Sequence, residues 1–161
     1  MDYSSIEVLA EISVGLVGFS GLTVVVGRSH FRHLGVAYRI RGLLYTSSTA
    51  LLACIAILVN VPLPAASYAL GFAILGTLIW SGLSLRKNKE GVRTNPFLTW
   101  SLSPLSVLVF VALILAPWRW PQQNLAIYEA AIGFSLLVSL IYFIRLVVST
   151  SSDGDANADD A

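Results

Sequence analysis

Charged residues are scarce in this chain of 161 residues, and their scarcity decides its class. Charged side chains make up 12% of the sequence, whereas a soluble domain has roughly 25%. In contrast, 56% of the residues are hydrophobic and the mean hydropathy is +0.77. This composition excludes a soluble globular domain and predicts an integral membrane protein with the lipid bilayer as its surroundings. The net charge of +1 gives no reason to expect a nucleic-acid partner.

Residues that carry enzyme chemistry are also few. The single cysteine, Cys54, lies in an apolar run, so neither an intramolecular disulfide nor a cysteine-based metal site is expected. His30 and His33 have no cysteine or acidic residue near them to complete a metal site. The sequence has no nucleophile elbow, zinc-protease motif, P-loop or dinucleotide fingerprint. We therefore expect no enzyme activity, cofactor or metal.

Apolar runs long enough to cross a bilayer are what the sequence does contain. They cover residues 6–27, 43–61, 65–85, 97–116 and 125–148. The second and third runs are separated by Pro62-Leu63-Pro64, which predicts a hairpin. Residues 1–148 are thus predicted to form an all-α transmembrane bundle of five spans. If the first run lies partly in the interface because of Glu7 and Glu11, four spans remain.

The orientation follows from the basic residues, because cytoplasmic loops retain Lys and Arg. Five spans place nine of the ten basic residues on one side and only Arg119 on the other. This predicts an N-terminus outside and a C-terminus in the cytoplasm of a bacterial plasma (inner) membrane. Residues 149–161 carry four aspartates and no apolar residue larger than alanine, which predicts a disordered acidic tail.

Aromatic side chains also fit this topology, because amphipathic rings prefer the two membrane interfaces. The outer interface is predicted to hold Tyr68, Trp118, Trp120 and Tyr128, and the inner one Tyr38, Tyr45 and Trp100.

Intramembrane carboxylates are the most specific candidates for function. Glu7, Glu11, Gly15 and Gly18 line one stripe of the first predicted helix, and Ser13 lies on the opposite face. Polar or small residues on two sides predict that this helix lies inside a bundle. Glu11 and Glu129 are each about 6 to 8 Å from the start of their helix, at matching depths. We interpret Glu7, Glu11 and Glu129 as ion or proton contacts, or alternatively as residues that only fix packing.

Glycines and arginines supply two further sets of candidates. Gly15, Gly18, Gly21 and Gly133 are predicted to let helices approach closely, within the chain or in a homo-oligomer. The arginines are predicted to hold an anionic lipid or a cytoplasmic protein partner, or alternatively to set the topology alone. They are Arg28, Arg32, Arg39 and Arg41. Residues 45–49 form a polar run (Tyr-Thr-Ser-Ser-Thr) that covers all sides of a helix, so part of it must face other helices or a wet vestibule.

A resemblance covers roughly the first 65 residues. Ala10-Glu11 followed by Gly-Phe-Ser-Gly-Leu at 18–22, then Arg39-x-Arg41 at the start of the next span and Pro62 at its end, resembles small multi-pass bacterial membrane proteins of uncharacterised function. The resemblance implies a bacterial plasma membrane and a helical bundle, and no substrate or cofactor. From the residues we predict an oligomeric cation or proton channel. The alternative is a structural or interaction subunit that docks a cytoplasmic partner or anionic lipid through its basic loops.

Overall fold

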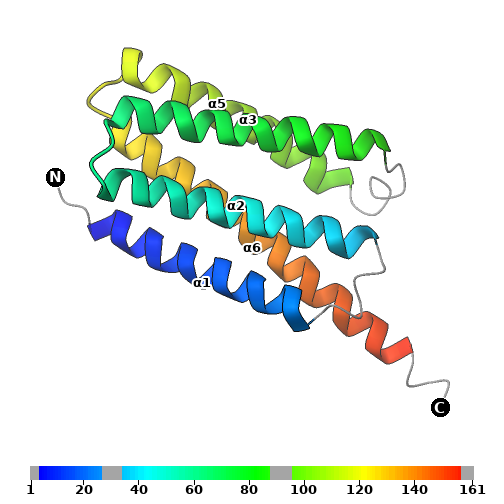
Figure 1. Cartoon of the computed structure of the whole chain (residues 1–161). Coiled ribbons are helices and arrows are strands. Elements are labelled where there is room, and N and C mark those ends of the chain that lie inside the picture. The colour runs from blue at the N-terminus through cyan, green and yellow to red at the C-terminus, as the bar shows by residue number, and fades with distance from the viewer. Residues whose placement is uncertain (1–3, 27–33, 88–95, 157–161) are drawn as a thin grey trace.

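Among the residues that the structure describes, all regular structure is α-helical, as expected. The computed structural model describes residues 4–26, 34–87 and 96–156. Its helices are α1 (Ser4–Val26), α2 (Leu34–Leu58), α3 (Leu63–Lys87), α5 (Pro96–Arg119) and α6 (Asn124–Ala156). The helices run roughly along one direction, and the two ends of the chain lie at opposite ends of the bundle (Figure 1).

The helices pack unequally. α2 makes its most extensive contacts with α6 and then with α1, whereas α3 packs mainly on α5. Consecutive helices α2 and α3 have a much smaller interface. The bundle therefore consists of a group α1, α2 and α6 and a pair α3 and α5, and Figure 1 shows α1 and α3 on opposite sides of α2.

Within the described ranges, three helices contain stretches that are long and apolar enough to cross a membrane. These stretches are Ile40–Leu58, Leu63–Trp80 and Asn124–Val147, and Pro104–Arg119 is a shorter apolar stretch. Large apolar side chains also point outward from the bundle; Leu52, Phe72 and Leu108 are each more than 60% exposed. An apolar outer surface of this kind is typical of a protein that is surrounded by lipid.

The turn between α2 and α3 confirms the predicted break between the second and third apolar runs. Asn60 adopts a left-handed conformation (φ 62°), which asparagine tolerates better than most residues. The Val61 N–H donates to Ala56 O and the Asn60 N–H to Ile57 O, each at 2.9 Å. This pair of bonds is a Schellman motif, so Asn60 ends α2 before the first proline of the turn is reached.

The helices are longer than the apolar runs that predicted them. α2 begins at Leu34, whereas the second apolar run begins at residue 43. α6 continues to Ala156, into the segment where a disordered tail was expected, and residues 157–161 lie outside the described residues. Hydropathy marks only the apolar part of a helix, whereas the helix itself continues through polar residues until a breaker ends it.

Candidate functional site

The predicted carboxylates lie on two helices that begin at the same end of the bundle. Glu7 and Glu11 are exposed on α1, while Ile6 and Ser13 on the other face of this helix are fully buried. α1 packs against α2 and α6 and lies at the edge of the chain's own bundle, not inside it as expected (Figure 1). The Ser13 hydroxyl on the buried face has its hydrogen-bond partner within α1, because Ser13 Oγ donates to Leu9 O at 2.7 Å.

Glu129 is partly buried on α6 and joins that helix to α1. Its Oε1 accepts a hydrogen bond from Ser5 Oγ at 2.8 Å. Ser5 lies six residues before Glu11, or about 9 Å along the helix axis. Glu129 is therefore level with the first turn of α1, and its depth matches Glu7 more closely than Glu11.

The predicted helix-packing glycines have open surroundings within the described residues. An added Cβ at Gly15, Gly18, Gly21 or Gly133 would meet nothing within 4 Å. Close approach occurs at other glycines. A Cβ on Gly42 would lie 3.0 to 3.2 Å from the Tyr142 ring, and one on Gly71 would lie 3.4 Å from Ile114. These four glycines therefore bring no helices of the described chain close together. Their role in packing against a second molecule stays a prediction.

The predicted arginine cluster is described in part. Arg28 and Arg32 lie outside the described residues, as does the side chain of Arg39. Arg41 is exposed on α2 and lines a cavity between α2 and α3. Docking of a cytoplasmic protein through these arginines stays a prediction.

The polar run at 45–49 divides between the two sides of α2, as expected for a run that covers all sides of a helix. Thr46 and Ser47 face inward: Thr46 Oγ1 and Ser139 Oγ of α6 are 2.6 Å apart, and Ser47 Oγ donates to Leu43 O at 2.7 Å. Tyr45, Ser48 and Thr49 line the cavity instead. The hydroxyls on the α6 side are therefore used for packing, and those on the α3 side are open.

The cavity is a groove of about 920 Å³ between α2 and α3, which we call the α2–α3 groove. Its apolar part is lined by the leucines Leu44, Leu52 and Leu70 and by six small residues. The small residues are Ala53 and Ala56 on α2, and Ala66, Ala69, Ala73 and Gly76 on α3. On α3 they recur every three or four residues, which places them on one face of the helix. The groove extends from Arg41 to Ala56 on α2, a length of about 22 Å at the rise of an α-helix.

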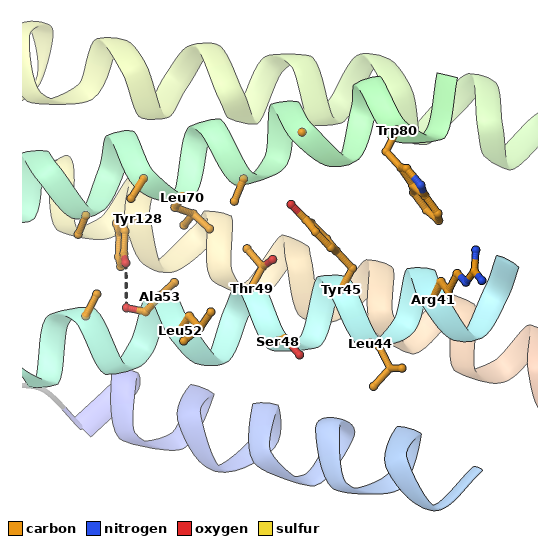
Figure 2. Close-up of a pocket in the computed structure, with 15 residues that line it drawn as sticks. Arg41, Leu44, Tyr45, Ser48, Thr49, Leu52, Ala53, Leu70, Trp80 and Tyr128 are labelled. Atoms are coloured by element: carbon orange, nitrogen blue, oxygen red, sulfur yellow. Dashed lines mark hydrogen bonds between the residues drawn. The ribbon is translucent and has the colours of Figure 1, made fainter. Parts of the chain in front are cut away.

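Tyr128 of α6 closes the apolar end of the groove. Its side chain is fully buried, and its hydroxyl donates to Ala53 O at 2.8 Å (Figure 2). The Tyr128 ring thus lies inside the bundle and not on its outer surface, and its level in the membrane stays a prediction. Tyr68 and Trp118, predicted at the same interface, are joined by a hydrogen bond from Trp118 Nε1 to Tyr68 Oη.

Polar side chains gather at the opposite end of the groove. Figure 2 shows Arg41 of α2 and Trp80 of α3 at this end, with Tyr45 pointing from α2 toward α3. A Cβ on Gly76 would lie 3.5 Å from Tyr45 Oη, so the glycine gives the phenol room beside α3. The groove therefore has an apolar part lined by alanines and a polar end that carries one positive charge.

Sequence reasoning missed the groove, although it noticed several of its parts. It interpreted Arg41 and the polar run 45–49 separately. The alanine spacing at 66, 69 and 73 was the available signal, but small residues at this spacing are more often used for tight helix packing.

The function is inferred from the geometry of the groove, because comparison with known proteins gives no match: neither the protein-family models, nor the curated proteins, nor the solved structures matched this chain. The resemblance of roughly the first 65 residues to small multi-pass bacterial membrane proteins stays a prediction.

Proposed function

We propose that the chain is a five-span protein of the bacterial plasma membrane, with its N-terminus outside and its C-terminus in the cytoplasm. The support is the set of five helices, three of which are long and apolar enough to span. An odd number of spans also keeps nine of the ten basic residues on one side. In this topology, the Arg41 end of the α2–α3 groove faces the cytoplasmic leaflet.

We further propose that the protein binds an amphipathic membrane molecule in the α2–α3 groove. One observation carries this proposal: small residues face each other across the groove, yet the helices do not close upon each other. Alanine and glycine on facing helices normally allow close backbone approach. Here they line a space of about 920 Å³ instead, and an empty apolar space loses packing contacts on all its walls.

The dimensions of the groove suit such a ligand. Small-molecule sites are mostly apolar clefts of about 300 to 1,000 Å³ with a few placed polar groups. One leaflet with its headgroups is about 20 to 22 Å thick, half of a whole bilayer of about 40 to 45 Å. The groove, at about 22 Å, has the length of one lipid molecule.

The test is to fill the groove. Ala73→Phe places a ring in the apolar part, and Ala130→Phe places the same ring on an exposed part of α6 outside the groove. We expect native mass spectrometry of protein purified in mild detergent to show a retained lipid with the unchanged chain and with Ala130→Phe, and none with Ala73→Phe. Equal retention in all three proteins would contradict the proposal.

A cation or proton channel is the second candidate, and the exposed carboxylates of α1 favour it. Glu7 and Glu11 share an exposed stripe with Gly15 and Gly18, where no neighbouring atom of the described chain would meet a Cβ. A carboxylate that faces lipid is costly, so a homo-oligomer with this stripe turned toward a central path would remove the cost.

Liposome flux assays test the channel. We expect the reconstituted protein to pass protons or a monovalent cation, and Glu11→Gln together with Glu129→Gln to reduce the flux. No flux with the unchanged protein, or the same flux with the double variant, would overturn this candidate.

A further inference from the structure

The polar end of the α2–α3 groove indicates which amphiphile it takes. We propose that the groove selects an anionic phospholipid, with its phosphate against Arg41 and its acyl chains along the alanines. This inference rests on the proposed function, because it needs a groove that holds a lipid. It adds the chemical class of the head group and the direction in which the lipid lies.

The polar side chains on the groove side of α2 are not used by the packing of the described chain. In the part of the chain that the structure describes, the side chains of Arg41, Tyr45, Ser48 and Thr49 form no hydrogen bond or ion pair with other residues, although all four line the groove. By contrast, Thr46 and Ser47, between them on the same helix, are both bonded. The donors on the groove side are therefore available to a ligand.

The donors at the polar end of the groove suit an anionic head group. An arginine guanidinium presents a planar fork of N–H donors that matches phosphate oxygens, and Arg41 places one at the polar end of the groove. The Tyr45 hydroxyl, one turn further along α2, points toward α3 and away from Arg41 (Figure 2), so it offers a neutral donor deeper in the groove than the phosphate. None of the described residues that line the groove is acidic, so none of them would neutralise Arg41 or repel a phosphate.

The lining of the groove changes from polar at one end to apolar at the other, which sets the direction of a bound lipid. Arg41 and Tyr45 lie at one end together with Trp80, an aromatic type that prefers the level of the head groups. Ala53, Ala56 and Ala66 lie toward the other end, beside Tyr128. A lipid with its phosphate at Arg41 places its chains on the alanines, whereas the reverse orientation would put the phosphate in an apolar pocket.

The test compares head groups that carry the same acyl chains. The full-length protein is exposed to detergent micelles with equal amounts of phosphatidylglycerol and phosphatidylcholine, and the bound lipids are counted by native mass spectrometry. We expect the unchanged chain to retain phosphatidylglycerol about tenfold over phosphatidylcholine, as one charge-assisted contact provides. Arg41→Gln should retain both equally, while the matched control Arg119→Gln, at the other end of the bundle, should keep the preference.

Equal retention by the unchanged chain, or a preference that survives Arg41→Gln, would overturn the head-group inference while leaving the groove as a lipid site. If the unchanged chain retained no lipid at all, the proposed function itself would fail; that proposal is tested separately with Ala73→Phe. A final arm adds excess inorganic phosphate. The bound phosphatidylglycerol should remain, because its chains hold it; its displacement would show a site for free phosphate and contradict the lipid assignment.

Discussion

The two sides of α2 show how similar small and hydroxyl-bearing residues produce opposite results. Toward α6, Gly42 admits the Tyr142 ring and Thr46 meets Ser139 at 2.6 Å, so the helices are in close contact. Toward α3, alanines and a glycine face a groove of about 920 Å³, and Ser48 and Thr49 line it. The same residue types build a tight interface on one side and a cavity on the other.

The difference depends on what each small residue faces. Gly42 is opposite a large ring that fills the space left by the missing side chain. On the other side, α2 alanines are opposite α3 alanines, and nothing within the described chain fills the space between them. A small residue thus closes an interface only when its neighbour is complementary in volume, and a pair of small surfaces held apart makes room for a ligand.

The largest expected effect comes from placing a phenylalanine ring in the core and comparing it with the same ring in the groove. Ala50 is fully buried in the core, whereas Ala73 lines the groove. Ala50→Phe overpacks the core and should lower the free energy of unfolding by about 3 kcal/mol. Ala73→Phe enters free space and should change the free energy of unfolding by no more than about 0.5 kcal/mol. Unfolding in SDS, followed by circular dichroism, measures both, and equal losses would show that the groove is not open.

A smaller effect is expected at two glycines on the interacting helices. Gly42→Val pushes against the Tyr142 ring and should cost about 1 to 2 kcal/mol of stability. Gly133→Val is the matched control, since its Cβ position is open, and should have little effect in the monomer. The same unfolding assay decides the matter; a Gly133 variant as damaged as the Gly42 variant would mean that Gly133 packs against a second molecule.

The smallest effect is the coupling between the hydroxyls. A double-mutant cycle with Thr46→Val and Ser139→Ala should give about 0.6 kcal/mol, the typical size of such bonds between membrane helices. The control cycle pairs Ser48→Ala with Ser139→Ala and should give no coupling, because Ser48 lines the groove. Coupling of equal size in both cycles would contradict the division of the polar run between the two sides of α2.

The helices were largely predictable from the sequence. Apolar runs located all five, and Pro62 with Pro64 indicated the break after α2. The ends were less predictable, because polar residues extend helices such as α6 beyond the run that hydropathy detects. Asn60 as the residue that ends α2 depends on its left-handed backbone, which the sequence only permits.

The candidate site was predictable only in part. Arg41 and the polar run 45–49 were both noticed, and the run does divide between a helix contact and a cavity. What the sequence did not show is which helix each side faces. The burial of Tyr128 and the edge position of α1 depend on pairings between distant segments, which one sequence without known contacts does not specify.

The central claim is that the α2–α3 groove is occupied by lipid chains, and alanine methyl groups report this most directly. Ala53 and Ala66 are 6% and 2% exposed and line the groove, whereas Ala50 and Ala131 are as deeply buried elsewhere. In deuterated protein with labelled alanine methyls, embedded in lipid nanodiscs, we predict NMR cross-peaks between lipid chains and Ala53 and Ala66, and none to Ala50 and Ala131. Absence of lipid cross-peaks at Ala53 and Ala66, with exposed Ala130 showing them, would contradict the account.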